Sequence, residues 1–513
     1  MTAAFHTAEQ LFLAQNLGGC IALCREILTE QPGLVAAQHL LAVALVRDGR
    51  AAEGAALLSR ALRAEPAELL LRMDCALAFA SLGEIDRAVI ILAEGARHHA
   101  GNPDLAARLA RLLSDHGRHA EAQAVLRAAL AARPDHLELR GLLAAELAAD
   151  LAIVPALEQM RLMQAILPGQ GPLYANEGVL RQSLGDLSGA ISAYDRAVRL
   201  DPLNHVAQVN YGTALMTKGD YRLGFARYEH RLFLPDMRLP PSGLPRWQGE
   251  TLAGKRLLVS AEQGFGDLLQ FIRFLPLLKR FGGEIWLDCP NEMKRLMASL
   301  PGVAGTVSPG EKAPPFDFAI PLLSLPWLLG SGDALASELI PYIHAPDIYA
   351  AGEGPVLPAD PRKKIGLVWS GRPAKGELFI RRTLARRSCK LAELEPLWSQ
   401  DRFRWFSLQL GDPCGELAGT PISDLAPMIS DFADTAALIG QLDLVISIDS
   451  AAAHLTAAMG RPLWLLLAPG QCDYRWNGVQ GASPWYPDVR LFRAGVGGFS
   501  KLATEVASEL FSF

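Results

Sequence analysis

"GRAAEGAALL" (residues 49–58), "GEIDRAVIIL" (83–92), "GRHAEAQAVL" (117–126) and "GDLSGAISAY" (185–194) are four versions of one phrase, and its spacing decides the fold of the N-terminal part. Each phrase begins with glycine, and these glycines lie 34 residues or a multiple of 34 apart. The same spacing continues to Gly219 and back to Gln15, and it passes through Leu151, where the glycine is replaced. Residues 1–235 therefore contain about seven copies of one unit.

Two columns of small residues keep the same register, seven positions before the turn and five after it. Small side chains at two fixed places let the two helices of a unit pack closely, and a proline ends most units. The period and the columns resemble the tetratricopeptide family, which implies an α-solenoid of helix–turn–helix units over residues 1–235. The columns are Ala8, Ala42, Ala76, Ala110, Ala144, Gly178 and Gly212, and Cys20, Gly54, Ala88, Ala122, Ala156, Ala190 and Gly224.

Such an array exposes a long concave surface, because each unit buries its apolar face only against its neighbours. We expect this groove to bind an extended peptide or an acceptor protein. A dimerisation surface and a rigid spacer are the alternatives, and the sequence predicts no oligomeric state.

Composition limits the other classes of function. The 513 residues are too many for one core, and a formal net charge of −5 gives no basic surface for nucleic acid. Seven cysteines without a paired pattern fit a reducing compartment, so we expect a cytoplasmic protein. The N-terminus has no signal-peptide pattern, and no apolar run is long enough to span a membrane.

The hydrophobic period changes after a stretch rich in proline and glycine, which predicts a linker at 236–253. Two sets of strand–helix units follow, beginning with "KRLLVSA" and "KKIGLVWSG". They predict two Rossmann-like lobes with parallel sheets, at 254–355 and 362–513. Ligands of such sheets bind at the carboxyl ends of the strands. A helix is predicted over "LLQFIRFLPLLKRFG" (268–282).

The join between a strand and a helix in "VISIDSAAAHLTAAMG" (445–460) is a candidate phosphate site. Ser450 is placed to cap the helix, and the first turn contains only alanines, so free N–H groups face the cleft. His454 lies one turn further on the same face. In the alternative interpretation Ser450 is only a cap and His454 packs under the sheet.

The segments "EQGFGDLLQFIRFLP" (262–276) and "DFADTAALIGQLDLVISIDSAAAHLTAAMGRPLWLLLA" (431–468) are similar to the heptosyltransferase-like glycosyltransferases. Together with the repeats, the chain resembles bacterial tetratricopeptide proteins fused to such a domain, over about residues 245–495. The resemblance implies a GT-B fold with a C-terminal donor-binding lobe, and sugar transfer from a nucleotide donor without a metal or cofactor. The chain has no Asp-x-Asp triplet of the kind that metal-dependent transferases use.

The resemblance also implies roles for individual residues. Asp267 matches the family's Gly-Asp motif and is the expected general base, with Glu262 as second candidate; the alternative is that Asp267 only caps its helix. A basic loop after the strand "GLVWSG", containing Arg381, Arg382, Arg386 and Lys390, is either a charge partner for a diphosphate or a solvated loop. The expected donor-binding residues are Gly264, Gly266, Ser370, Gly371, Arg387, Ser388, Gln409, Asp434, Thr435, Asp449, Ser450 and His454.

These observations predict an inverting glycosyltransferase whose repeats recruit the acceptor. A protein acceptor, for example a flagellin-like surface protein, is expected, and a saccharide acceptor is the alternative. A second hypothesis of another class is a scaffold protein whose glycosyltransferase domain has lost its chemistry.

Overall fold

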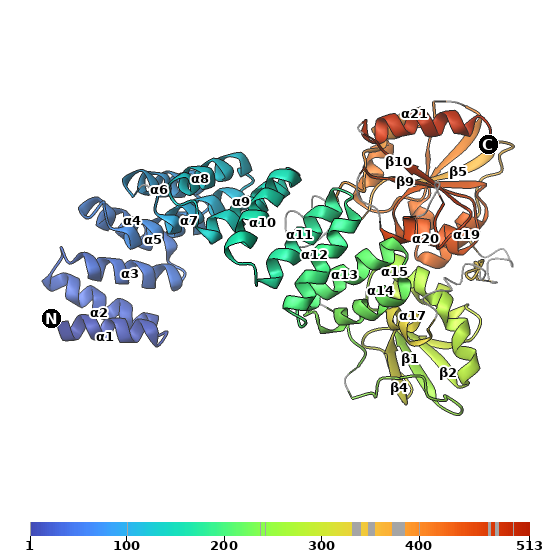
Figure 1. Ribbon diagram of the computed structural model, residues 1–513, viewed down its shortest axis with the longest axis horizontal. Coiled ribbons are helices and arrows are strands. Elements are labelled where there is room, and N and C mark those ends of the chain that lie inside the picture. The colour runs from blue at the N-terminus through green and yellow to red at the C-terminus, as the bar shows by residue number, and fades with distance from the viewer. Residues whose placement is uncertain are drawn as a thin grey trace. The chain divides into compact units, whose positions relative to one another are not determined.

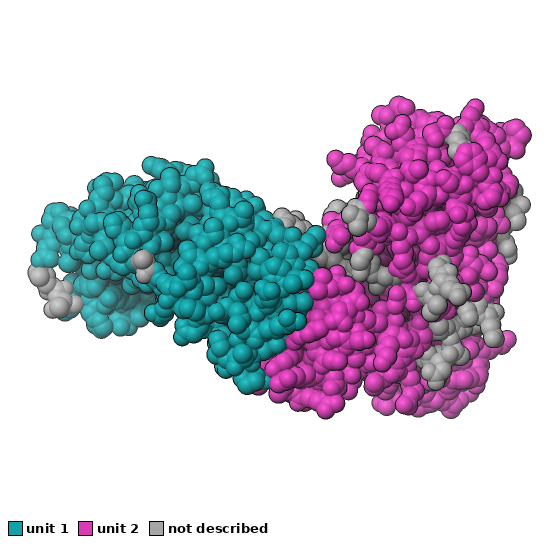
Figure 2. Space-filling view, turned by 45° about the horizontal axis from the view of Figure 1, so that its top comes forward, with its two compact units in different colours: residues 1–168 teal, residues 169–513 magenta. Residues whose placement is uncertain are grey.

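The computed structural model describes residues 2–99, 101–235, 237–241, 243–330, 340–346, 354–371, 385–399, 401–469, 473–477, 482–495 and 497–513. The chain divides into two compact units, residues 1–168 and 169–513 (Figure 2). The first unit contains repeat helices only. The second contains the last two repeats, the segment 236–253 and both α/β lobes (Figure 1). The domain boundary at 236–253 stays a prediction.

The repeats form a run of paired helices in both units, which confirms the predicted solenoid fold (Figure 1). Each pair is one 34-residue unit. The helices are α1 (Thr2–Leu13), α2 (Leu17–Glu30), α3 (Val35–Arg47), α4 (Ala51–Ala64), α5 (Leu69–Ser81), α6 (Ile85–His98), α7 (Pro103–Asp115), α8 (His119–Ala132), α9 (Leu137–Ala149), α10 (Ile153–Ile166), α11 (Gly171–Ser183), α12 (Leu187–Leu200), α13 (His205–Lys218) and α14 (Tyr221–Tyr228).

The turn inside every unit uses a left-handed backbone conformation. Gly49 has φ +86° and Gly219 has φ +99°. The two units without a turn glycine keep the geometry, because Gln15 has φ 59° and Leu151 has φ 60°. Left-handed φ is costly for a residue with a Cβ atom. The unbroken conformation confirms the register of 34, and it leaves a local strain at Leu151.

We expect Leu151→Gly to stabilise the compact unit of residues 1–168 by about 1 kcal/mol, because glycine adopts φ near +60° without steric cost. Leu151 is 39 % exposed, so little burial is lost. Thermal unfolding followed by helical circular dichroism measures the change. Leu82→Gly is the matched control: Leu82 is 38 % exposed but has φ −87°, so glycine should lower the melting temperature there. A destabilised Leu151→Gly protein would contradict the interpretation.

The small columns lie where the helices of a unit cross. A Cβ atom built on Gly54 would lie 2.5 Å from Cγ2 of Val46 and 2.7 Å from the carbonyl oxygen of Ala42. Cys20 and Ala122 in the same column are completely buried. The side chains at these positions are small because the helix backbones leave no more room.

The first lobe is a four-stranded parallel sheet of order β3-β2-β1-β4. Leu257 and Val259 on one face of β1 pack into the main core, and Leu258 lies in a smaller cluster on the other face. The predicted helix over 268–282 is divided into α15 (Phe265–Phe271) and the 3₁₀ helix η2 (Ile272–Phe281). η2 contains Pro276, which cannot donate an α-helical hydrogen bond. The strands are β1 (Arg256–Ser260), β2 (Glu284–Asp288), β3 (Val303–Val307) and β4 (Phe318–Pro321), and the helices that follow β2 and β4 are α16 (Asn291–Ala298), η3 (Leu322–Ser324) and α17 (Leu325–Leu328).

The second lobe is a six-stranded parallel sheet of order β10-β9-β8-β5-β6-β7. Ile446 on β8 packs toward α21 on one face, and Val445 packs toward α19 and α20 on the other (Figure 1). This double cover is why the strands are continuous apolar runs. The elements are β5 (Lys363–Val368), η6 (Leu391–Leu397), β6 (Phe403–Ser407), η7 (Asp412–Leu417), β7 (Ser423–Asp424), η8 (Ala426–Met428), α19 (Phe432–Gly440), β8 (Leu444–Ile448), α20 (Ala451–Ala458), β9 (Leu463–Leu467), η9 (Tyr474–Trp476), β10 (Val489–Arg493) and α21 (Gly498–Leu510).

The segment between the repeats and the first sheet packs against that sheet. Trp247 is completely buried, its backbone N–H donates to the Ala319 carbonyl (3.0 Å), and its indole donates to the Glu250 carbonyl (2.9 Å). Met216 and Phe225 of the last repeat belong to the same core cluster as residues of both lobes. One hydrophobic core therefore continues from the last repeat into the α/β lobes.

Candidate functional site

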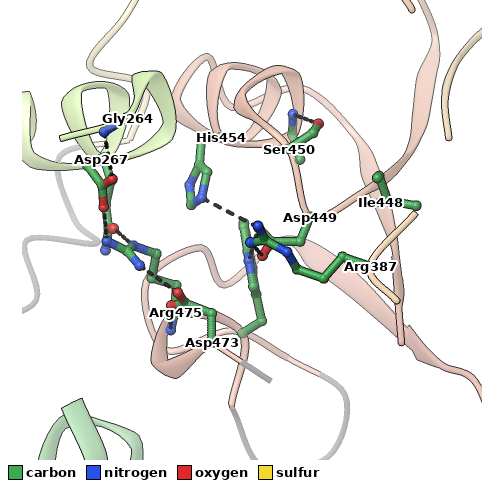
Figure 3. Close-up of polar contacts among 12 residues, drawn as sticks. Gly264, Asp267, Arg387, Ile448, Asp449, Ser450, His454, Asp473 and Arg475 are labelled. Carbon is green, nitrogen blue, oxygen red and sulfur yellow. Dashed lines mark hydrogen bonds and ion pairs between the residues drawn. The ribbon is translucent and has the colours of Figure 1, made fainter. Parts of the chain in front are cut away.

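The carboxylate of Asp267 lies where the first lobe faces the second (Figure 3). Strand β1 ends at Ser260, a short loop follows, and Asp267 stands in the first turn of α15. Its Oδ2 accepts from the Gly264 N–H at 3.1 Å, so the residue does cap its helix. Its Oδ1 accepts from Nη2 of Arg475, which comes from η9 of the second lobe. Asp267 therefore caps its own helix and also contacts the second lobe.

Arg475 is the centre of a charge cluster between the lobes. Only 7 % of the residue is exposed, its Nη1 donates to Asp473 Oδ2 at 2.7 Å, and its Nε donates to Gln270. Burial raises the pKa of Asp267, Arg475 opposes this by lowering it, and Asp473 adds to the rise. A carboxyl with a raised pKa is a stronger base once ionised, which suits proton transfer near neutral pH.

The join of β8 and α20 forms the second side of the site. The Ser450 Oγ accepts from the Ala453 N–H at 3.2 Å, as predicted for an N-cap. The same Oγ lies 2.9 Å from the Ser447 Oγ at the end of β8. Ala451 and Ala452 are partly exposed, so no bulky side chain covers the first turn of α20 from its own residues.

His454 is buried (5 % exposed) and its ring packs against Trp476, with ring centroids 4.8 Å apart. Burial lowers the pKa of His454 to about 3, with Arg475 as the next cause. The ring is therefore neutral at physiological pH. Its Nδ1 lies 3.1 Å from the Tyr486 hydroxyl.

The other ring nitrogen of His454 faces Asp449, because Nε2 lies 3.9 Å from Asp449 Oδ1. The Tyr486 hydroxyl beside Nδ1 also lies 3.4 Å from the Tyr342 hydroxyl, which itself donates to the Leu269 carbonyl at 3.0 Å. The neutral ring therefore has polar neighbours at both nitrogens, and in the tautomer with its proton on Nε2 it is an N–H donor on the side of Asp449.

The two lobes touch at this histidine. A Cβ atom built on Gly266 of α15 would lie 2.8 Å from Cδ2 of His454. A larger residue at position 266 would displace the His454 ring or move α15 away from α20. Gly264 and Gly266, predicted as donor-binding residues, therefore lie at the Asp267 end of the site, and Gly266 permits the close approach.

Asp449 joins two of the predicted groups. Its Oδ1 accepts from the Trp476 indole at 2.8 Å, and its Oδ2 accepts from Arg387 Nη1 at 3.2 Å (Figure 3). Arg387 belongs to the basic loop after β5 and is one of the residues expected to bind the donor. Arg386 and Lys390 are exposed, and Arg381 and Arg382 lie outside the described residues.

A second polar group lies at the carboxyl ends of β5 and β6. Gln409 Oε1 accepts from the N–H groups of Trp369 and Ser370 at 3.2 and 2.9 Å. Ser388 Oγ accepts from the Gly371 N–H at 3.0 Å. Gln409 and Ser388 therefore hold the backbone that follows β5.

Asp434 and Thr435 lie in the first turn of α19. Arg295 of the first lobe reaches across to this turn: its Nη2 is 2.8 Å from Asp431 Oδ1 and 2.9 Å from Asp434 Oδ1. The Thr435 hydroxyl donates to the Asp431 carbonyl at 3.1 Å. A cavity of about 450 Å³ opens beside this bridge and is lined by Arg295, Pro355, Met428, Ser430, Asp431 and Asp434.

Glu262 lies in different surroundings from Asp267. Its side chain has no exposed surface, and its Oε1 accepts from Arg231 Nη2 (2.7 Å) and from the Leu323 N–H (3.0 Å). Burial raises the pKa of Glu262 and Arg231 opposes the rise. This carboxylate contacts none of Asp449, Ser450 and His454. Asp267 is therefore the better candidate for the general base.

Four residues of the site were missed by sequence reasoning: Asp473, Arg475, Trp476 and Tyr486. The run "DYRW" (473–476) after the strand "LWLLL" combines two charges with two aromatic rings at the carboxyl end of a strand, and that is the signal that marks it. The position of Arg475 opposite Asp267, 208 residues earlier in the chain, has no local signal.

No group of three His, Cys, Asp or Glu side chains among the described residues is arranged to hold a metal ion. No helix in the described part of the chain is both long enough and apolar enough to cross a membrane.

Comparison with known families agrees with this architecture. Residues 79–146 match one tetratricopeptide repeat family, and residues 39–104 and 176–223 match another. Residues 416–471, from η7 to the loop after β9, match glycosyltransferase family 9 (heptosyltransferase). The chain thus contains tetratricopeptide repeats followed by a C-terminal region that is similar to glycosyltransferase family 9.

Individual relatives are distant. Protein FlbA of Caulobacter vibrioides is 27 % identical over 529 residues, which cover 94 % of this chain and 85 % of FlbA. Among solved structures, YrrB, a TPR protein with an unusual peptide-binding site, is 18 % identical with a TM-score of 0.30 and covers 36 % of this chain and 95 % of its own. MamA from Desulfovibrio magneticus RS-1 is 22 % identical with a TM-score of 0.29, over 32 % of this chain and 93 % of its own.

Proposed function

We propose that this chain of tetratricopeptide repeats and a family 9 region is an inverting glycosyltransferase that uses a nucleotide-sugar donor without a metal or cofactor. One observation carries the proposal. Asp267 on α15 and the corner formed by Asp449, Ser450 and His454 lie on opposite lobes, and the lobes meet between them at Gly266 and His454. This arrangement supports a proton acceptor on one lobe and a phosphate-binding group on the other, on either side of one lobe junction.

In the proposed reaction Asp267 accepts the proton of an acceptor hydroxyl as that oxygen attacks the anomeric carbon of the donor sugar. The bond between this carbon and the phosphate oxygen breaks, and the nucleoside diphosphate leaves with the bonding electrons. A single displacement of this kind inverts the anomeric configuration. Arg475 holds the Asp267 carboxylate in place and offsets the effect of burial on its pKa.

The leaving diphosphate gains negative charge, and its proposed binding partners are three groups around Asp449. They are the N–H groups of Ala451 and Ala452 at the start of α20, the ring of His454 with its proton on Nε2, and the guanidinium of Arg387. Fixed donors of this kind stabilise developing charge without reorganising, which is the work a divalent cation performs in other transferases.

The acceptor is proposed to be a protein, of the flagellin-like class, recruited by the groove of the repeats in the cytoplasm. This rests on the concave surface that stacked units expose. A scaffold without catalysis is the second candidate, and one observation favours it: both oxygens of Asp267 are already engaged, by Gly264 and Arg475.

Nucleotide binding separates the two candidates. We expect one nucleotide from a panel of UDP, GDP, ADP, TDP and CMP to raise the melting temperature of the full-length protein. His454→Ala should lower affinity for that nucleotide about ten- to a hundredfold, because a hydrogen bond to a charged group contributes roughly 1.5–3 kcal/mol. Calorimetric titration measures the change.

Thr456→Ala is the matched control. Thr456 is fully buried in the same helix, but its hydroxyl donates only to the Ala452 carbonyl at 2.7 Å. It should affect stability and leave affinity unchanged. A panel without any stabilising nucleotide favours the scaffold, and an unchanged affinity in His454→Ala removes this histidine from the donor site.

A further inference from the structure

We propose that the last repeat is part of the catalytic apparatus, and that Arg231 and Tyr228 are positioning residues for the loop that leads to Asp267. This rests on the proposed function of Asp267. The loop covers residues 261–264, between β1 and α15, and we call it the base loop. The inference follows from contacts that join the base loop to helix α14 and to the 3₁₀ helix η1 (Glu229–Phe233).

The first contact is the buried ion pair of Arg231 and Glu262. The guanidinium is 1 % exposed and the carboxylate has no exposed surface. Arg231 Nη2 also donates to the Ser324 hydroxyl at 3.0 Å, and its Nη1 donates to Glu229 at 2.7 Å. Buried ion pairs often add little net stability, but they fix the position of the segments that carry them. Here one segment is the end of the repeats and the other is the base loop.

The second contact is on the next residue of the base loop. The Tyr228 hydroxyl accepts from Gln263 Nε2 at 2.8 Å and lies 3.1 Å from Gln263 Oε1. Two successive residues of the loop are therefore held by residues three apart on the repeat side. Gly264, whose N–H bonds to Asp267, follows at once.

The last repeat also contacts the elements on either side of the cluster. Phe225 of α14 packs edge-on against Phe271 of α15 and against Trp485, with ring centroids 6.0 and 6.2 Å apart. Asn477, two residues after Arg475, donates to the Thr217 carbonyl of α13 at 2.9 Å. The repeat thus holds both the helix that carries Asp267 and the segment that carries Arg475.

These contacts explain why Glu262 lies so near the catalytic carboxylate without facing the donor corner. Its partner Arg231 comes from the repeat side, so Glu262 connects the base loop to the array, while Gly264 at the other end of the loop bonds to Asp267. A displacement of α14 reaches Asp267 through at most a few residues of backbone. If a partner that binds the array moves the last repeat, the movement reaches the general base Asp267 through the base loop.

Tyr228→Phe tests this in the full-length protein, because it removes only the hydroxyl and keeps the ring. We expect amide hydrogen exchange in peptides covering 256–270 to become roughly three- to tenfold faster, as expected for the loss of one hydrogen bond. Turnover, measured as nucleoside diphosphate released from a panel of nucleotide sugars, should fall by a similar factor while the KM for the donor stays unchanged.

Tyr211→Phe is the matched control. Tyr211 is on α13, and its hydroxyl lies 3.4 Å from Asp195 of the preceding helix, away from the base loop. It should change neither exchange in 256–270 nor turnover. Equal exchange in this segment for Tyr228→Phe and the wild type would overturn the proposal, as would equal acceleration in both variants.

A double variant tests the proposal on the ion pair, independently of the Tyr228 hydrogen bond. Arg231→Met with Glu262→Gln removes the ion pair and leaves no unpaired buried charge at these two positions, so folding should be preserved. Faster exchange in 256–270, with unchanged exchange in β5 and β8, is the expected result. Unchanged exchange in 256–270 overturns the proposal. Exchange does not depend on catalysis, so a wild type that turns over no donor counts against the proposed function alone.

Discussion

Asp267→Asn is expected to lower kcat by about 10²- to 10⁴-fold and to leave nucleotide affinity nearly unchanged. The carboxamide keeps the shape of the carboxylate and can still accept from Arg475, but it cannot take the proton of the acceptor. Loss of a positioned general base has a cost of this size. The donor corner of Asp449, Ser450 and His454 is untouched. Release of nucleoside diphosphate at saturating donor measures kcat, and calorimetric titration measures affinity.

Asp473→Asn is the matched control, because it removes the other carboxylate that Arg475 contacts. Asp473 raises the pKa of Asp267, so its neutral replacement should lower that pKa. A base acts only when ionised, and activity is lost as pH falls through its pKa. The acidic limb of the rate profile should therefore move to lower pH in Asp473→Asn, with kcat on the plateau largely kept. If Asp267→Asn retains a kcat near that of the wild type, Asp267 is only a helix cap.

Arg475→Met is expected to destabilise the unit of residues 169–513 by about 3–5 kcal/mol, the usual effect of leaving a buried charge without its partner. The Arg475 side chain is 9 % exposed and forms ion pairs with two carboxylates, Asp267 and Asp473. The variant leaves both carboxylates without this partner, and it also loses the hydrogen bond from Arg475 to Gln270. Thermal unfolding of the full-length protein, followed by tryptophan fluorescence, measures the change.

A triple variant provides the control for this effect. Arg475→Met combined with Asp267→Asn and Asp473→Asn contains no unpaired charge at the three positions, and it should recover most of the lost stability. If it is as unstable as Arg475→Met alone, the effect comes from lost packing on Tyr474, whose ring lies 4.4 Å from the guanidinium, and not from charge.

The parts of this molecule that depend on near neighbours in the chain were accessible from sequence. The period of 34 and the small columns predicted the repeats, and even the substituted turn at Leu151 keeps the left-handed backbone. Ser450 caps α20 as predicted, because a cap needs only the three residues that follow it. The two parallel sheets were predicted from continuous apolar runs, which are typical of strands that are covered on both faces of a sheet.

The resemblance to a glycosyltransferase family identified Asp267, Asp449 and His454 as candidates, and the structure places them around one junction of the two lobes. The structure also shows that Arg387 donates to Asp449. The sequence could not predict this contact, because the two residues are 62 positions apart. Their roles in binding and catalysis stay predictions. The helix expected over 268–282 is divided because a proline inside it outweighs the amphipathic pattern.

What the sequence determined by itself is the order of the elements, the repeat register and the chemistry available at each strand end, because these depend on periodicity and on contacts a few residues long. Only the tertiary structure decided which charges meet. The bond from Arg475 to Asp267 and the ion pair of Arg231 with Glu262 join segments 208 and 31 residues apart. Burial makes a charge without a partner costly, so these charges meet inside the shared core, and no local pattern in the chain records which of them pair.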